Sequence, residues 1–224
     1  MDLRLIVFDV DGTLVDSQDE IVAAMGAAFE GASETPPPRA AILSIVGLSL
    51  PVAVRTLAPH LSDAGVEAVV AGYKHHFMTA RVGGALPALY PGALDALRHL
   101  HGQDGNLLGI ATGKSRRGLS GLLSAHALDG YFVTRQVADD HPSKPHPSML
   151  QSCLRETGVA ADRGIMIGDT TYDMQMGRAA GLRTIGVTWG YHNEDLLKDA
   201  GADLLLRDYA ELADAIDDML RGAA

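Results

Sequence analysis

Two aspartates, Asp9 and Asp11, stand where the first apolar segment of the chain ends. That segment, residues 3–8, is rich in strand-forming residues, and Gly12 then lets the backbone turn away. Because ligands of a parallel sheet bind beyond the carboxyl ends of its strands, we expect both carboxylates to lie at a binding site. Two carboxylates this close repel each other and need a cation or a proton. The spacing therefore suggests that a hard metal cation and a nucleophile share this place.

Other segments carry polar residues at comparable positions. Thr112 and Gly113 follow one apolar segment, Asp169 and Asp173 follow another, and Lys144 lies in a proline-stiffened loop before a predicted helix. Parallel strands bring such ends to one edge of a sheet. The hydroxyl of Thr112, the N–H group of Gly113 and the ammonium of Lys144 would bind phosphate oxygens there. Together with the carboxylates, this set suits phosphoryl transfer.

The carboxylates account for the rest of that chemistry. Mg²⁺ prefers a few carboxylate oxygens, waters and a substrate phosphate oxygen. Asp9, the backbone carbonyl of Asp11 and Asp169 would supply the protein share of these ligands. Aspartate is also a known covalent nucleophile towards phosphate. The sequence thus predicts a Mg²⁺-dependent phosphoryl-transfer site.

Apolar segments alternate with helical patterns over the C-terminal half, which predicts right-handed βαβ units and a parallel sheet. The predicted strands that follow the first one are residues 107–111, 131–134, 164–167, 183–187 and 203–206. The predicted helices lie near residues 92–101, 114–125, 146–157, 172–180, 193–200 and 208–221. This pattern predicts an α/β fold with a Rossmann-like parallel sheet core, to which residues 3–8 contribute a strand.

About a hundred residues separate the first predicted strand from the second, and most of them read as helical. Residues 17–20, Ser-Gln-Asp-Glu, match a capping box that opens an Ala-rich helix. Three prolines end this helical region, and a long helix near residues 62–82 is closed by a pair of glycines, Gly83 and Gly84. We therefore expect an α-helical cap domain, residues 17–86, inserted into a catalytic core of residues 1–16 and 87–224.

The net charge of −10 and the composition argue against several classes of function. An acidic chain is unsuited to nonspecific binding of nucleic acid or anionic membranes. No apolar run approaches the roughly 20 residues that span a bilayer, and Asp9 interrupts the N-terminal run too early for a signal peptide. Cys153 is the single cysteine, so an intrachain disulfide is impossible and a reducing compartment is expected. We expect a cytoplasmic monomer or homodimer that acts on a small phosphorylated metabolite.

Taken in order, the motifs resemble those of the haloacid dehalogenase superfamily of hydrolases. The four motifs are Asp9-Val10-Asp11-Gly12-Thr13, Thr112, Lys144 and Gly168-Asp169-Thr170-Thr171-Tyr172-Asp173. The helical insertion falls between the first two motifs, where a subset of the family carries its cap. Within that subset the sequence is similar to phosphoglycolate phosphatases and related phosphatases of small substrates. Residues 15–17, 90–92 and 186–190 strengthen this similarity.

The resemblance implies a role for each motif residue. Asp9 would be the nucleophile that forms an aspartyl-phosphate. Asp11 would be the general acid–base, which protonates the leaving oxygen and then activates the hydrolytic water. Thr112 and Lys144 would bind phosphate, and Asp169 would complete the Mg²⁺ site.

Further expectations concern the neighbours of these motifs. Asp173 would orient either metal-bound water or the motif lysine. Gly113 departs from the family pattern, in which asparagine often follows the motif threonine, so a side-chain contact to phosphate is lost while the N–H group remains. In the cap, residues 47–49 are expected to reach the site on closure. One cap cation, Arg55 or Lys74, would pair with a carboxylate of the substrate.

Other functions share parts of the pattern. A phosphomutase of the same superfamily, such as a β-phosphoglucomutase, would use Asp9 and Asp11 and differ through a cap that excludes water. A phospho-accepting signalling module uses similar residues around Mg²⁺, but it needs no cap and no second aspartate as acid–base. A calcium-binding loop that begins at Asp9 is disfavoured because Leu14 stands where that loop needs glycine. Hydrolysis of a phosphate ester remains the leading prediction.

Overall fold

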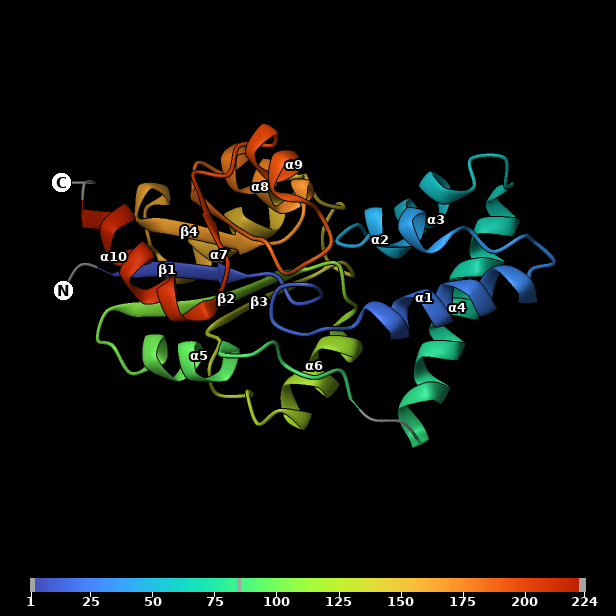
Figure 1. Ribbon diagram of the computed structural model, residues 1–224, viewed down its shortest axis with the longest axis horizontal. Coiled ribbons are helices and arrows are strands. Elements are labelled where there is room, and N and C mark those ends of the chain that lie inside the picture. Colours follow the sequence, from blue (N-terminus) through green and yellow to red (C-terminus); the bar gives the residue numbers. More distant parts are fainter. Residues whose placement is uncertain (1–2, 84–85, 222–224) are drawn as a thin grey trace.

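The computed structural model describes residues 3–83 and 86–221. A six-stranded parallel sheet forms the centre of the larger lobe, with the strand order β3-β2-β1-β4-β5-β6 (Figure 1). The strands are β1 Arg4–Phe8, β2 Asn106–Thr112, β3 Thr134–Val137, β4 Gly164–Gly168, β5 Arg183–Val187 and β6 Leu204–Leu206. Strand β1 lies between β2 and β4, so the residues that follow β1 lie between those that follow β2 and β4.

Both faces of the sheet are covered by helices, as the alternation along β1 requires. Leu5 and Val7 point into one hydrophobic cluster and Ile6 and Phe8 into another, and all four are fully buried. The helices of the face that receives Ile6 and Phe8 are α5 Ala93–His101, α6 Arg116–Ala125 and α10 Leu212–Arg221. Those of the opposite face are α7 Ser148–Thr157 and α8 Thr171–Ala179, and α9 Glu194–Asp199 contacts β5 and α8. The predicted α/β fold class is confirmed.

Strand β3 is the element whose predicted position was wrong. The other predicted strands agree with the structure to within one residue at each end, whereas the strand expected at residues 131–134 begins where the prediction ends. The apolar composition of residues 131–133 misled the prediction, because Val133 is 60% exposed and precedes the strand. The strand itself is polar: the buried side chains of Thr134 and Gln136 both donate hydrogen bonds to Glu156.

Four helices between β1 and α5 form a second lobe, seen at the right of Figure 1. They are α1 Gln18–Gly31, α2 Arg39–Ser44, α3 Leu50–Leu57 and α4 Asp63–Gly83. Helices α1 and α4 pack against each other within a hydrophobic cluster of their own, to which Met25, Phe29 and Val69 belong. These helices lie within residues 17–86, the range expected for the cap, and we call this lobe the cap. The glycine pair expected to close α4 lies only in part within the described residues, since Gly84 is outside them.

The start of α1 differs from the predicted capping box. Ser17 precedes the helix, but its hydroxyl makes no hydrogen bond to the first turn. It donates instead to Oδ1 of Asp11. In a cap the Ser17 oxygen would accept a hydrogen bond from a backbone N–H of the first turn, whereas here the hydroxyl donates to a charged carboxylate, which is a strong acceptor. The capping-box prediction was therefore wrong, and Ser17 belongs to the polar edge of the sheet.

The cap contacts the core through residues 45–49, which join α2 to α3. The backbone N–H of Ser49 donates to Oγ of Ser143 at 2.8 Å. Gly113, at the end of β2, lies against this loop: a Cβ atom built there would be 2.8 Å from two of its carbonyl oxygens. The lack of a side chain at residue 113 thus allows the cap backbone to approach the core.

Replacing Gly113 with alanine should loosen this contact. The new Cβ would be closer to backbone oxygens than packing permits, so residues 45–49 must shift and the Ser49–Ser143 hydrogen bond should weaken. We expect hydrogen exchange of the Ser49 amide, measured by NMR, to accelerate about two- to tenfold, which corresponds to one net hydrogen bond. Gly130→Ala is the control, since a Cβ there meets nothing within 4 Å. Unchanged exchange in Gly113→Ala would show that the loop does not depend on residue 113.

Candidate active site

Asp9 follows β1 and lies at the centre of the carboxyl edge of the sheet. Its side chain is 1% exposed, and Nζ of Lys144 lies 2.9 Å from its Oδ1. Neither carboxylate oxygen accepts a well-formed hydrogen bond from the described residues. Burial raises the pKa of Asp9 to about 7, opposed by the attraction of Lys144 and reinforced by repulsion from Asp173. A buried carboxylate with unused oxygens is suited to binding a cation or an electrophile.

Lys144 is completely buried between two carboxylates. Its Nζ lies 2.9 Å from Asp9 and 2.7 Å from Asp173. Burial alone would lower the pKa of this ammonium, but attraction by Asp173 and Asp9 outweighs burial and raises it above the ordinary value. Asp173 is fixed in turn by Thr170, whose N–H and hydroxyl both donate to Oδ2 and so leave Oδ1 for the lysine. Of the two roles expected for Asp173, the structure shows contact with the lysine.

Asp169 follows β4 and is fully buried beside this group. Thr13 donates to its Oδ1 at 2.8 Å, and the backbone N–H of Tyr191 donates to its Oδ2 at 2.9 Å. Burial first, and then repulsion by neighbouring carboxylates, raises the pKa of Asp169 well above the ordinary value. Gly12 makes room for the carboxylate, since a Cβ at that residue would be 2.2 Å from Oδ2. Its φ of +82° also favours glycine.

The carboxylates fit a divalent cation. Asp9, Asp169 and Asp173 each offer an oxygen, and these oxygens lie within 4.8 Å of one another. If all three are ionised, the single ammonium of Lys144 leaves two negative charges unbalanced, which is the charge that a divalent cation neutralises. An all-oxygen donor set is the one that Mg²⁺ prefers. The side chain of Asp11 is not part of this cluster.

Asp11 faces the cap and is held by two donors. Its Oδ1 accepts hydrogen bonds from Oγ of Ser17 and from Nζ of Lys114, the latter at 2.7 Å. Lys114 is buried, and sequence reasoning missed it because the first residue of a predicted helix is usually solvated. The signal that could have found it is its position two residues beyond Thr112, at the same strand end.

The residues expected to bind phosphate follow β2, which is the neighbour of β1. Ile110 pairs with Phe8, so Thr112 lies two residues further on, alongside the aspartate motif. Thr112 is 1% exposed, and its hydroxyl accepts a hydrogen bond from the N–H of Lys114 at 3.2 Å. Gly113 lines the cavity that lies above this edge. The structure therefore brings all of the predicted site residues to one edge of the sheet.

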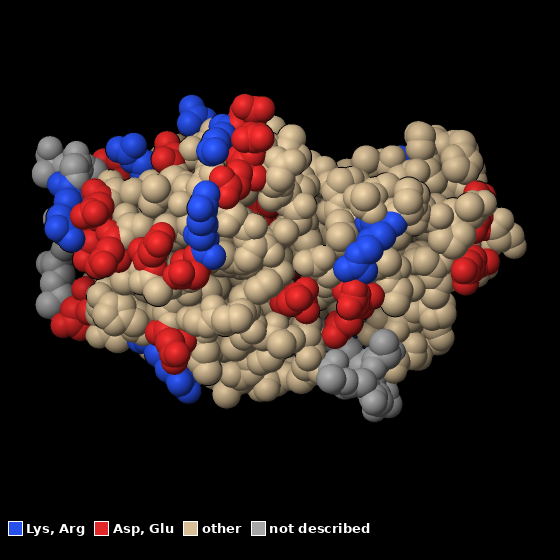
Figure 2. Space-filling model, viewed as in Figure 1, with Lys and Arg blue, Asp and Glu red and all other residues tan. Residues whose placement is uncertain are grey.

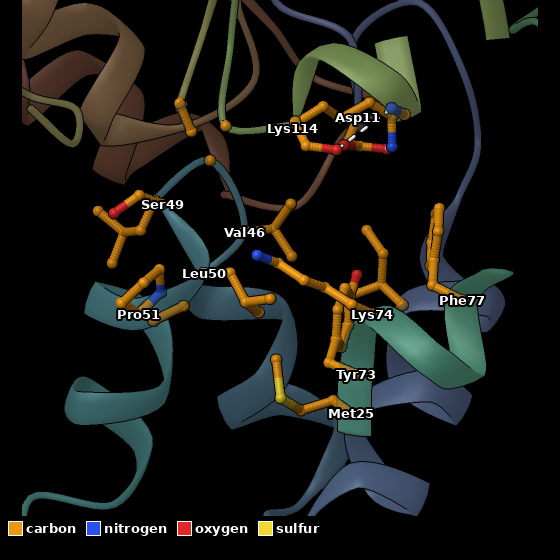
Figure 3. A pocket seen from close by; sticks show the side chains of 18 of the residues that line it. Asp11, Met25, Val46, Ser49, Leu50, Pro51, Tyr73, Lys74, Phe77 and Lys114 are labelled. Carbon is orange, nitrogen blue, oxygen red and sulfur yellow. Dashed lines mark hydrogen bonds and ion pairs between the residues drawn. The ribbon is translucent and has the colours of Figure 1, made fainter. Parts of the chain in front are cut away.

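A cavity of about 980 Å³ lies between this edge and the cap (Figure 3). Asp11, Lys114 and seven further residues of the core line it on one side, and helices α1, α3 and α4 together with residues 45–49 line it on the other. Of the two cap cations expected to meet a substrate carboxylate, Lys74 lines the cavity. Arg55 does not, because it forms an exposed ion pair with Asp63.

The outer surface gives a different kind of information. On the face shown in Figure 2, acidic and basic side chains are interspersed over the core, and the described residues form no continuous basic band there. This face lacks the electrostatic footprint of a nucleic-acid-binding surface. Within the described part of the chain, no helix combines the length and apolar character needed to cross a membrane.

Known proteins resemble this chain in sequence and in fold. The probable phosphatase IndB of Dickeya dadantii (strain 3937) is 37% identical over 220 residues, which cover 97% of this chain and 95% of that protein. A phosphoglycolate phosphatase of Pseudomonas fluorescens (strain Pf0-1) is 29% identical over 213 residues, covering 93% and 78%. The crystal structure of a hydrolase from Pseudomonas syringae superposes with a TM-score of 0.85 at 25% identity, covering 96% of this chain and 98% of that one.

The family model described as haloacid dehalogenase-like hydrolase matches residues 6–187. This region begins in β1 and ends with β5, so it contains the cap, the three buried aspartates and the buried lysine between them. The resemblance inferred from the order of the motifs is thus confirmed, and the chain belongs to the haloacid dehalogenase-like hydrolase family.

Proposed function

We propose that the protein is a Mg²⁺-dependent phosphatase that hydrolyses phosphate monoesters of small metabolites through an aspartyl-phosphate on Asp9. The observation that carries the proposal is the carboxylate of Asp9: it is buried, it is paired with the ammonium of Lys144 at 2.9 Å, and neither of its oxygens accepts a hydrogen bond of good geometry from the described chain. A purely structural aspartate at this depth is normally saturated with donors. The names of the relatives add support, since one is a probable phosphatase and another a phosphoglycolate phosphatase.

In the first half of the reaction, a carboxylate oxygen of Asp9 attacks the phosphorus of the ester. A bond from that oxygen to phosphorus forms while the bond from phosphorus to the leaving oxygen breaks. Asp11 delivers a proton to the leaving oxygen, and its place in the core-side wall of the cavity suits this role. Ser17 and Lys114 keep its carboxyl group in that direction. The alcohol departs into the cavity.

In the second half, water attacks the phosphorus of the aspartyl-phosphate and Asp11 accepts the proton of that water. Inorganic phosphate is released, and the carboxylate of Asp9 is restored. The hydroxyl of Thr112, the N–H of Gly113 and the ammonium of Lys144 hold the phosphate oxygens in both halves. Because Thr112 and Gly113 directly follow β2 and Lys144 is held by Asp173, these groups need little rearrangement as charge develops.

Asp9, Asp169 and the backbone carbonyl of Asp11 are the protein groups that would hold Mg²⁺. When bound, the ion supplies positive charge that allows an anionic nucleophile to meet an anionic ester. Asp173 fixes the ammonium of Lys144. The aspartates thus have different tasks. Asp9 and Asp169 would bind Mg²⁺, with Asp9 also the nucleophile, whereas Asp173 orients the ammonium of Lys144.

Substitution of the two motif aspartates tests the covalent route. Asp9→Asn should abolish turnover because an amide is no nucleophile, and Asp11→Asn should lower kcat by about a hundredfold or more. Mass spectrometry of acid-quenched wild type should locate phosphate on Asp9. Asp104→Asn is the control, since this exposed residue precedes β2 at the opposite end of the sheet. Phosphate on another residue would refute the mechanism, and an isomerised ester in place of inorganic phosphate would identify a mutase.

Removal of metal tests the cation site. Excess chelator should abolish hydrolysis, and added Mg²⁺ should restore it. Mg²⁺ at a hundredfold excess over its Kd should also stabilise the folded protein by about 2.7 kcal/mol, seen as a higher Tm. Asp169→Asn should lose this shift because it removes a ligand, whereas Asp104→Asn should keep it. Full turnover in chelator would exclude a metal-dependent reaction.

Lys144→Met tests the buried ammonium. The change leaves Asp9 and Asp173 buried without their cation, so the free energy of unfolding should fall by about 3–5 kcal/mol in urea titrations. The loss should be smaller in an Asp9→Asn background, where one charge is already gone. Lys198→Met, which removes an exposed ion pair, should cost about 0.5 kcal/mol or less. Strictly additive effects of Lys144→Met and Asp9→Asn would show that the two groups do not interact.

A further inference from the structure

The cavity between cap and core is larger than a two-carbon acid needs. Its volume of about 980 Å³ lies near the upper end of the roughly 300–1,000 Å³ of pockets that hold drug-sized ligands. The cap loop already touches the core through the Ser49–Ser143 hydrogen bond, so the volume does not come from a loop lifted off the core. The catalytic edge therefore opens into a chamber with room for a bulky leaving group.

The walls of this chamber are mainly apolar. On the cap side the lining side chains come from α1, α3, α4 and the loop of residues 45–49, and include Met25, Val46, Leu50, Pro51, Tyr73 and Phe77; core residues, Ser115 and Asp139 among them, line the opposite side. Figure 3 shows Leu50 and Pro51 across the cavity from Phe77, with Met25 and Tyr73 on the side away from Asp11. The rings of Tyr73 and Phe77 are stacked, with centroids 5.6 Å apart. Such a surface gains most from apolar and aromatic ligand atoms.

The cations that line the chamber are poorly suited to a substrate carboxylate. Lys114 is engaged, because its Nζ lies 2.7 Å from Asp11 and 5.2 Å from the ring centroid of Phe77. Lys74 reaches over the cavity in Figure 3, but it is exposed, as is Arg117 of α6. Charge pairs in contact with water are weak. The lining therefore favours an apolar leaving group over an acidic one.

We propose that the leaving group of the natural substrate is a ring-containing, mainly apolar alcohol that fills this chamber while its phosphate lies at Asp9. The inference rests on the proposed phosphatase function and narrows it to one substrate class. Each methylene group that is removed from water contributes about fourfold in affinity, so a ring system buried between α1, α3 and α4 outweighs one exposed ion pair. Phosphoglycolate would leave most of these walls without contact.

Three esters whose leaving groups are alcohols distinguish the classes. They are ethyl phosphate, phosphoglycolate and naphthylethyl phosphate, and the ethyl and naphthylethyl esters differ chiefly in the ring system. With Mg²⁺ and the wild-type enzyme, kcat/KM should be at least about tenfold higher for naphthylethyl phosphate than for the other two. Release of inorganic phosphate is the readout for all three.

A substitution that fills the cavity tests whether the ring of the substrate binds there. Leu50→Trp places an indole in the chamber and should lower the ratio of kcat/KM for naphthylethyl over ethyl phosphate at least tenfold. Val52→Trp is the control: Val52 lies on the same helix, is 41% exposed and does not line the cavity, so the ratio should keep its wild-type value. If Leu50→Trp fails to fold, the wild-type comparison decides alone.

Each outcome bears on one claim. Equal kcat/KM for the ethyl and naphthylethyl esters would overturn the substrate class and leave the phosphatase function standing. A preference for phosphoglycolate that is lost in Lys74→Ala would overturn it in favour of a carboxylate-bearing substrate. An unchanged ratio in folded Leu50→Trp would show that the ring does not occupy the chamber. Failure to hydrolyse any of the three esters, with Mg²⁺ present, would count against the phosphatase function itself.

Discussion

The buried ammonium of Lys144 is the interaction on which the rest of the site depends. It lies between Asp9 and Asp173, and without it the carboxyl ends of β1 and β4 would gather only like charges in a place that water hardly reaches. One ammonium is nevertheless too little for three carboxylates. The imbalance leaves Asp9 with fewer partners than the other two carboxylates, which is why we propose it as the nucleophile. The same excess of negative charge thus bears on both the stability of the fold and the proposed chemistry of Asp9.

Neighbouring groups restrict the site so that the imbalance falls on one residue. Thr170 occupies one oxygen of Asp173, and Thr13 and the amide of Tyr191 occupy both oxygens of Asp169. Asp9 receives no comparable donors among the described residues. The carboxylates are therefore chemically different although their burial is the same. The difference comes from the number of hydrogen-bond donors that lie close to each carboxylate.

Local pattern was enough to predict most of the fold and the position of the candidate site residues at one edge of the sheet. The strand before Asp9, the turn at the glycine after the aspartate motif, and the alternation of strands with helices can each be predicted from residues that are adjacent in the chain. The features that sequence reasoning missed depend on partners far away. Lys114 is 103 residues from Asp11, and only the fold brings them together. Ser17 matches a capping pattern with the residues that follow it, but its hydroxyl donates to Asp11, which precedes it and is not part of that pattern. Strand β3 is defined by pairing and by buried polar contacts to Glu156, which no apolar count reveals.

The two segments that join the cap to the core run side by side. Val15 forms an antiparallel bridge with Leu89, and the N–H of Asp16 donates to the carbonyl of Ala88 at 2.9 Å. The chain thus leaves the core and returns to it at one point. With respect to the sheet, the whole cap is an inserted loop whose two ends are held together. Lengthening or replacing such a loop changes its closure entropy only slowly. The paired junction of residues 15–16 with 88–89 therefore holds the two connections of the cap together at the core, independently of the length of chain between them.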